Sequence, residues 1–340
     1  MAEGLTRALD EMARRDVDVL VLGREGNARF VSEATRLWLA GTRPFAPGCV
    51  VVRGTGAVHL MSVTDAGVPA AIPPEQLYPM SWNPANIVGA VAAIPGVSGA
   101  RRIGVDGLTP LFEQLFAATL PDAELTDGEV VMRAARRVKS PDQVAHLRAA
   151  IALAEDAFGA AVAALRPGVR ESDLKGVFEE RMGRLGTTTP AFEGVFCVVD
   201  GGAPLRRFVS DRTLADGDLV AMSAGVLLDG WEGSLIRTWP AGTPAPGHRE
   251  RLSRWQAEWT RALDRCRAGV AVGELRTAPG VSLHGVGLGY EGIEDAAVLE
   301  PGMTVQMTLD AAGVVGGDVL LVGDGDADVL TAFPYGPAGE

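Results

Sequence analysis

The chain has 340 residues, 47% of them hydrophobic, so it is long enough for two domains and a sizeable buried core. Asp and Glu outnumber Lys and Arg by 43 to 31, and the formal net charge of -12 argues against a broad phosphate-binding surface, and so against DNA or RNA as a partner. No run of 18 apolar residues occurs, and the opening MAEGLTRALDEMARR lacks a secretion signal. We therefore expect a cytoplasmic protein with no membrane partner.

The first part of the chain is predicted to alternate helices and strands. Residues 4–15 have apolar positions at helical spacing, and DVDVLVLG after them is typical of a strand that ends in Gly23. GCVVVRGTGAVHLMS predicts a hairpin that turns at Gly54 to Gly56, and RRIGVDG predicts another short strand. These patterns predict an N-terminal α/β domain over residues 1–130.

The second part is predicted to begin with a long helix and to continue as β hairpins. Ser140 is a typical N-cap, and Pro141 suits the first helical position. A second helix is expected from RESDL. Strands are expected in AFEGVFCVVDGG, GDLVAMSAGVLLDGWEGSLIRTW and PGMTVQMTLDAAGVVGGDVLLVG, which have glycines at their turns. Residues 131–340 are therefore predicted to form an α+β domain.

Five segments resemble, in the same order, the motifs of the pita-bread family of creatinases, methionine aminopeptidases and Xaa-Pro peptidases. They are RRVKSPDQVAHLRAA, LRPGVRESDL, LADGDLVAMSAG, SLHGVGLGYEG and VLEPGMTVQM, and the final AFPYGP is similar to creatinase. The resemblance covers nearly the whole chain. It implies an N-terminal α/β creatinase-like domain, a C-terminal pita-bread domain and a homodimer.

The resemblance also implies a metal site, from which this sequence departs. Metal-binding members hold two divalent ions with two aspartates, one histidine and two glutamates, because such ions need several anionic oxygens. At those positions this chain has Ser223, Ser234, His284, Thr308 and Gly317. Neutral hydroxyls and one imidazole do not hold two divalent cations at cellular concentrations, so we predict no metal and no other cofactor. A shift of the alignment by one residue would bring Asp310 or Asp318 nearer and leave a single weakly held ion open.

Four residues are candidates for the chemistry. His284 is the predicted acid or base, because it is expected to titrate near neutral pH; the alternative is a hydrogen-bonded histidine with no catalytic role. Ser234 is a candidate nucleophile activated by His284, although no Gly-x-Ser-x-Gly motif surrounds it and a space-filling role fits it better. Glu291 is a candidate carboxylate partner, as is Glu232, and the alternative for both is a solvated loop position.

Other residues are candidates for holding a substrate. Arg206 and Arg207 lie in the loop before residues 217–239, where they would hold a carboxylate or else be surface charges. The rest of the predicted binding set is Ser223, Thr308 and Trp231. Without anionic partners, such a site does not suit the cationic creatine. Arg237, flanked by apolar strand residues, is expected to need a buried partner.

The hypothesis that follows is a metal-independent, creatinase-like hydrolase or lyase acting on a small C–N-bonded, carboxylate-bearing molecule. One alternative is a catalytically inactive pita-bread module that binds a peptide or a protein. Another is a Xaa-Pro peptidase with an atypical metal site. The spacing of Trp255 and Trp259, four residues apart on a helix, indicates core or dimer packing rather than an aromatic cage.

Overall fold

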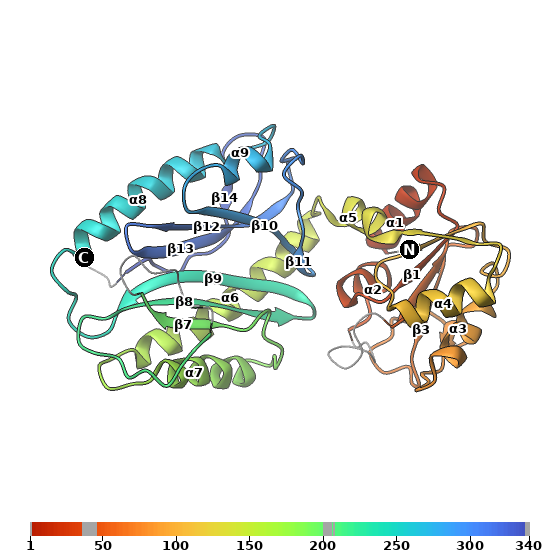
Figure 1. Ribbon diagram of the computed structural model, residues 1–340, viewed down its shortest axis with the longest axis horizontal. Helices are drawn as coiled ribbons and strands as arrows, with labels where there is room; N and C mark the ends of the chain where they lie inside the picture. The colour runs from red at the N-terminus through yellow and green to blue at the C-terminus, as the bar shows by residue number, and fades with distance from the viewer. Residues whose placement is uncertain (1, 36–45, 200–205, 207, 337–340) are drawn as a thin grey trace. The chain divides into compact units, whose positions relative to one another are not determined.

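A computed structural model shows two compact units, residues 1–137 and 138–340. The ranges that the structure describes are 2–35, 46–199, 206 and 208–336. The predicted domain boundary at residue 131 lies inside helix α5 (Gly128–Arg136), which belongs to the first unit. Each unit has its own sheet (Figure 1).

The first unit is built around a mixed sheet with the strand order β4-β3-β2-β1-β5-β6. Its strands are β1 (Val19–Leu22), β2 (Cys49–Val52), β3 (Ala57–Met61), β4 (Leu77–Tyr78), β5 (Arg102–Val105) and β6 (Glu124–Asp127). Its helices, besides α5, are α1 (Glu3–Arg14), α2 (Glu25–Ser32), α3 (Pro84–Ala92), α4 (Pro110–Thr119) and the 3₁₀ turn η1 (Pro74–Gln76). The predicted hairpin is confirmed as the antiparallel pair β2 and β3.

The second unit is built around a larger sheet with the order β11-β10-β12-β13-β9-β8-β7, with β14 paired to β13. Its strands are β7 (Val195–Val198), β8 (Leu219–Leu228), β9 (Trp231–Pro240), β10 (Val281–Gly287), β11 (Gly289–Glu291), β12 (Thr304–Ala311), β13 (Val314–Leu321) and β14 (Asp328–Val329). Its helices are α6 (Pro141–Ala164), α7 (Glu171–Arg184), α8 (His248–Arg265) and α9 (Val272–Arg276). None of the helices in the described ranges combines the length and the hydropathy that a bilayer crossing requires.

Local sequence rules explain where these elements begin and turn. Ser140 caps α6 with a capping box, and Pro141 is its first residue, as predicted. The hairpin of β8 and β9 turns through Asp229 and Gly230, whose φ angles of 49° and 86° belong to the turn type that matches strand twist. The hairpin of β12 and β13 turns in the same way through residues 312–313.

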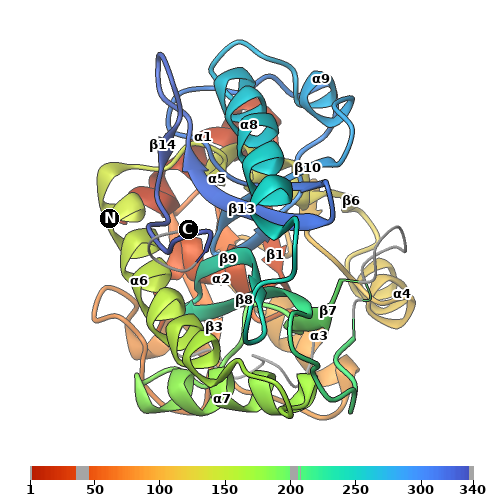
Figure 2. The same ribbon diagram turned by 90° about the vertical axis from the view of Figure 1, so that its left-hand side faces the viewer.

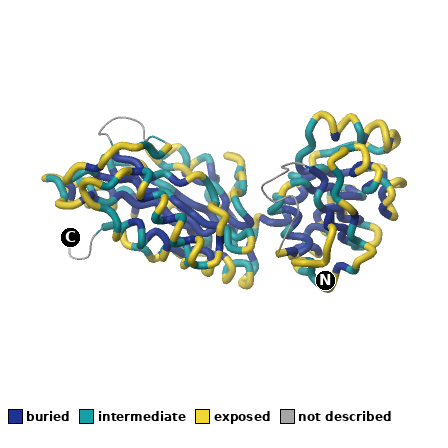
Figure 3. Tube along the Cα trace, turned by 90° about the horizontal axis from the view of Figure 1, so that it is seen from below, coloured by how far each residue is buried: buried dark blue, intermediate teal, exposed yellow. Residues whose placement is uncertain are grey.

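Two glycines allow helices to lie against the long hairpins. A Cβ at Gly233 of β9 would lie 2.1 Å from the backbone of Ala150 in α6. A Cβ at Gly316 of β13 would lie 2.4 Å from the ring of Trp255 in α8. Figure 2 shows α6 beside β8 and β9, α7 beside α6 and β7, and α8 beside β13. The strands between these helices are the buried part of the unit (Figure 3).

The paired tryptophans of α8 belong to the interior of the second unit. Trp255 and Trp259 stack with their ring centroids 5.5 Å apart, and both are buried. Trp255 also donates to the carbonyl oxygen of Leu309 over 3.0 Å. These rings therefore pack in the core, and they give no support to a dimer contact through α8.

Arg237 has the buried partner that its sequence context predicts. Its guanidinium donates to Asp318 Oδ1 over 2.8 Å, and the two side chains are 1% and 2% exposed. It also donates to the carbonyl oxygens of Gly317 and Phe333, and it lies over the ring of Tyr335. The arginine thus joins β9 to β13 and to the C-terminal segment.

Replacing Asp318 by Asn should lower the free energy of unfolding by about 3 kcal/mol, because it leaves the buried Arg237 charge uncompensated. The matched control is Asp328→Asn, which breaks the exposed pair with Arg148 and should cost less than about 1 kcal/mol. Chemical denaturation followed by tryptophan fluorescence measures both. Equal losses in the two variants would contradict the assignment of Arg237 and Asp318 as a buried structural pair.

Candidate active site

The register of the second sheet brings three of the predicted positions into one row. Ser223 of β8 lies opposite Ile236 of β9, Ile236 lies opposite Gly317 of β13, and Gly317 lies opposite Thr308 of β12. Residues opposite each other in antiparallel strands point to the same side of the sheet. The hydroxyls of Ser223 and Thr308 therefore lie on the same face of the sheet, which we call the site face.

The site face is the side of the sheet that lies away from α6 and α7. Gly233 is in contact with the backbone of α6, and Leu235 packs in the core that α6 and α7 form with the sheet. Since side chains alternate along a strand, Ser234 and Ile236 point to the other side. Ser234 thus lies on the site face, opposite Gly225 of β8.

His284 lies on β10, where it pairs with Gln306 of β12. It is half-buried, and its ring stacks on Tyr290 with the centroids 4.9 Å apart. Burial, together with the nearby charge of Arg276, lowers the pKa of His284 to about 4. The prediction that His284 titrates near neutral pH is therefore wrong, and its imidazole is neutral at pH 7.

Glu232 is a buried carboxylate on the site face. Its side chain is 2% exposed, so the interpretation of this residue as a solvated loop position is wrong. Ser234 Oγ lies 3.0 Å from Glu232 Oε1. Burial raises the pKa of Glu232 to about 7, the charge of Glu291 adds to this effect, and the hydrogen bond from Ser234 opposes it. Glu232 therefore titrates near neutral pH, the range that the sequence predicted for His284.

Gln306 extends this polar network and was not among the predicted residues. Its Oε1 lies 3.3 Å from Ser234 Oγ, and the residue is 2% exposed. Its Nε2 atom is buried without a hydrogen-bond partner among the described residues. The sequence did contain a signal for Gln306, because it is two positions from Thr308 on a strand with alternating side chains, just as the candidate Glu232 is two positions from Ser234.

Glu291 is also enclosed rather than solvated. Its Oε2 atom lies 2.6 Å from Lys139 Nζ, and the two side chains are 11% and 2% exposed. A Cβ at Gly287 would lie 2.2 Å from Glu291 Oε1, so a glycine is needed beside this pair. The interpretation of Glu291 as a solvated loop residue is wrong, and Lys139 is a partner that the sequence analysis missed.

Arg206 is held by a protein carboxylate. Its guanidinium donates to Glu171, which is fully buried and also accepts from Val198 N over 2.8 Å and from Ser210 Oγ over 2.7 Å. Arg206 therefore helps to fix the loop before β8 to the start of α7. Arg207, the other arginine predicted to bind substrate, lies outside the described residues.

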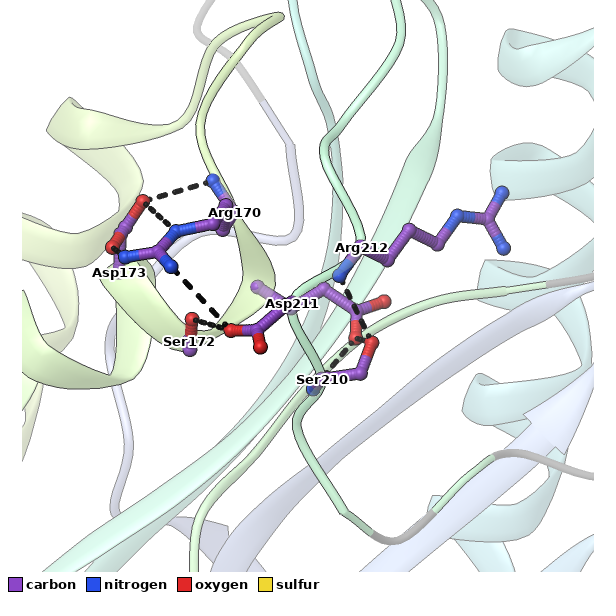
Figure 4. Close-up of polar contacts among 7 residues, drawn as sticks. Arg170, Ser172, Asp173, Ser210, Asp211 and Arg212 are labelled. Carbon is purple, nitrogen blue, oxygen red and sulfur yellow. Dashed lines mark hydrogen bonds and ion pairs between the residues drawn. The ribbon is translucent and has the colours of Figure 1, made fainter.

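Exposed contacts strengthen the same junction (Figure 4). Arg170 donates to Asp173 over 2.7 Å and to Asp211 over 3.5 Å, and Ser172 donates to Asp211 over 3.3 Å. These bonds tie the first turn of α7 to the segment that leads into β8. The junction therefore positions the strand that carries Ser223.

Trp231 lies at the beginning of β9 and packs toward α6. Its ring stacks on that of His146, with the centroids 5.6 Å apart and the planes 10° apart. It also borders the apolar cluster that includes Leu147 and Ile151 of α6. The ring points toward α6 and not to the site face, so the structure does not support the predicted contact of Trp231 with a substrate.

The residues on the site face do not fit two divalent cations. No three His, Cys, Asp or Glu side chains in the described ranges come together as a metal-binding group. Asp318 accepts from Arg237, Thr331 and Tyr335, and Asp310 is exposed. At Gly317 a Cβ would lie 2.3 Å from the Met307 carbonyl oxygen, so even the start of a glutamate side chain has no room there.

Glu232→Gln should change how stability depends on pH. The pKa of Glu232 rises from 4.5 to about 7 on folding, so the stability that its proton contributes is present below pH 4.5 and is lost as the pH rises through 7. Relative to wild type, E232Q should therefore gain on the order of 3 kcal/mol in free energy of unfolding between pH 4.5 and pH 8. Urea denaturation at several pH values measures this difference.

The comparison isolates Glu232 from the other titrating groups. His284, whose lowered pKa favours the folded state above pH 6.5 and loses that contribution toward pH 4, is present in both proteins and cancels. Glu250→Gln, on the exposed side of α8, is the matched control and should follow wild type. Parallel curves for wild type and E232Q would show that Glu232 does not hold a proton near pH 7.

The chain matches metallopeptidase family M24 over residues 145–316 and the creatinase/prolidase N-terminal domain over residues 5–138. It is 22% identical to a Xaa-Pro dipeptidase from Pyrococcus horikoshii, over 81% of this chain and 74% of that protein. It is 25% identical to creatinase from a Bacillus species, over 98% of this chain and 90% of that protein.

Solved structures show the same fold. The prolidase from Pyrococcus horikoshii OT3 superposes with a TM-score of 0.78 at 18% identity, covering 98% of this chain and 99% of that one. A Xaa-Pro dipeptidase from Bacillus anthracis gives a TM-score of 0.79 at 20% identity, with 98% of each chain covered. The predicted family and fold class are confirmed. This chain belongs to metallopeptidase family M24, with a pita-bread unit that follows a creatinase/prolidase N-terminal domain.

Proposed function

We propose that this protein is an enzyme that hydrolyses a C–N bond in a small, carboxylate-bearing molecule without a divalent metal ion. The reaction class follows the family, whose similar members include a Xaa-Pro dipeptidase and a creatinase. Independence from metal is supported by the donor set, since Ser223, Ser234, Thr308 and Gly317 supply no carboxylate.

The observation that carries the proposal is the buried carboxyl group of Glu232. Burying an ionisable group costs free energy, and a site without any role would lose such a group readily. A general acid or base works best when its pKa lies near the operating pH, and burial brings the pKa of Glu232 to about 7. The site face thus retains a proton carrier, although the carboxylates that the resemblance implies for metal-binding members are replaced in this chain.

In the proposed chemistry Glu232 transfers the proton, and His284 and Ser234 hold the reacting groups in place. The ionised Glu232 takes a proton from water as the water oxygen attacks the carbon of the C–N bond. The same carboxyl then returns the proton to the leaving nitrogen as that bond breaks, so protons balance. The neutral imidazole of His284 accepts a hydrogen bond from the substrate or donates one to it. The hydroxyl of Ser234 orients the carboxyl group of Glu232.

The proposal places the enzyme in the cytoplasm as a homodimer. The family resemblance supports this assignment. Light scattering on the purified protein measures the assembly, and a monomeric mass would overturn the dimer.

Metal-free protein should hydrolyse at least one member of a panel of Xaa-Pro dipeptides and N-acyl amino acids in the presence of EDTA. Addition of Mn, Co or Zn should not raise the rate, because the site face offers no carboxylate cage. Amino-acid analysis of the products, with elemental analysis of the protein, measures both. Activity only with metal would favour an atypical Xaa-Pro peptidase. Binding without turnover would favour an inactive peptide-binding module.

Glu232→Gln should lower kcat/KM at least a hundredfold, because proton transfer by a positioned side chain contributes factors of about 100 to 10,000. The wild-type rate should rise with pH and level off above about pH 7 as the carboxyl ionises. E250Q is the control for the loss of a carboxylate on the surface. A wild-type rate in E232Q would remove Glu232 from the mechanism.

The role of His284 is tested in the same assay. His284→Gln keeps a side chain that can donate and accept a hydrogen bond and should retain more activity than His284→Ala. Both variants should keep the wild-type melting temperature, so that loss of turnover reports on substrate contact. Unchanged turnover in His284→Ala would contradict a catalytic role for the histidine.

A further inference from the structure

The site face carries a group of polar atoms that have no protein partner. Within the described residues, the hydroxyl of Thr308 and the ring nitrogens of His284 make no hydrogen bond, and both residues are half-buried. Gln306 Nε2 also lacks a partner, and its residue is only 2% exposed. His284 and Gln306 are opposite each other on β10 and β12, and Thr308 is two residues along β12 from Gln306. These three side chains therefore form one cluster, the β12 cluster.

A buried amide nitrogen without an acceptor costs free energy, so the Nε2 group of Gln306 indicates where an acceptor atom belongs. While Glu232 is protonated, the hydrogen-bond pattern decides which way the Gln306 amide faces. Ser234 has one hydroxyl proton and lies between two acceptor oxygens, Glu232 Oε1 and Gln306 Oε1. When Glu232 donates its proton to Ser234, Ser234 donates to Gln306 Oε1. The amide then presents Nε2 as a donor.

The charges around the β12 cluster favour an anion over a cation. Arg276 lies close enough to His284 to disfavour its protonation. The same arginine forms a pair with Asp295, whose side chain is 74% exposed. Lys139 and Glu291 neutralise each other, and Glu232 is neutral when it carries its proton. The β12 cluster itself contains no carboxylate, and the acidic residue of β12 is the exposed Asp310, two positions beyond Thr308.

We propose that the β12 cluster binds the carboxylate of the substrate, with Gln306 Nε2, the Thr308 hydroxyl and a His284 ring N–H as donors. This inference rests on the proposed function and adds the orientation of the molecule. From β12 the row of site residues runs over Gly317 and Ile236 to Ser223, a span of about 14 Å at ordinary strand spacing. A carboxylate at the β12 end places the rest of a small substrate over β13 and β9, where Ser234 and Glu232 lie.

The structure also accounts for the apolar part of such a molecule. Ile236, on the row between the β12 cluster and Ser223, forms a small apolar cluster with Ala221 and Val315, which lie beside that row. Gly317, the other residue of the row between them, adds no side chain. A short N-acyl amino acid, with its carboxylate at one end and its amide in the middle, has the matching order of groups.

Calorimetric titration with N-acetylglycine at pH 6 tests the proposal, with N-acetylglycinamide as the uncharged control ligand. The carboxylate should bind at least tenfold more tightly than the amide. Gln306→Glu, which places a negative charge at the donor position, should weaken binding of N-acetylglycine at least tenfold, and Thr308→Val should weaken it severalfold. Gln256→Glu, on the exposed side of α8, makes the same charge change away from the site and should bind as wild type does.

Outcomes of this titration are separate from those of the turnover assay. Equal binding of the two ligands, no binding of either, or wild-type binding by a folded Gln306→Glu variant would overturn the carboxylate site. Selective binding of N-acetylglycine that Gln306→Glu abolishes supports the site, even where no member of the panel is hydrolysed. Hydrolysis without selective carboxylate binding would keep the proposed function and reject this orientation of the substrate. Thermal melts establish that each variant folds.

Discussion

The buried guanidinium of Arg237 holds together the two halves of the sheet on which the site depends. The strands β9 and β13 are paired through Ile236 and Gly317. Arg237 donates to the carbonyl oxygens of both residues and to the carboxylate of Asp318. The row that carries Ser223 and Thr308 is continuous only because the two hairpins meet in this register. The arginine thus contributes to the site without lying on the site face.

Burial acts on the two titrating groups of the site face in opposite directions. It raises the pKa of Glu232 and lowers that of His284, and in both cases it favours the neutral form. The charged groups that remain nearby, Lys139 and Glu291, are paired with each other. Within the described residues, this face offers a divalent cation no cluster of carboxylates. It suits the proton transfer that we propose for Glu232.

Local features of the fold could be predicted from the sequence because they obey local rules. The cap at Ser140 and the hairpin before and after Asp229 follow from turn and capping preferences of a few neighbouring residues. The need of Arg237 for a buried partner followed from its apolar neighbours. The confirmed family and fold rested on several motifs in order, which is a stronger signal than any single motif.

The electrostatics of the site could not be predicted in the same way. The burial of Glu232 depends on which strand face the rest of the chain covers, and Lys139 is separated from Glu291 by 152 positions in the sequence. The pKa of His284 depends on packing around β10 and on Arg276, which a motif does not contain. The available signal was the alternation of side chains along β9 and β12. It places Glu232 on the same face as Ser234, and Gln306 on the same face as Thr308.

The close approach of β12 and β13 at Gly317 has a consequence for substitutions at that position. A single substitution cannot place a glutamate there, because the backbone of the neighbouring strand occupies the place of its first side-chain atom. The strands would have to move apart before the new side chain could contribute to binding an ion, and until then the substitution would only destabilise the fold. A side chain at residue 317 and the present spacing of β12 and β13 therefore exclude each other, and the backbone itself holds this position to glycine.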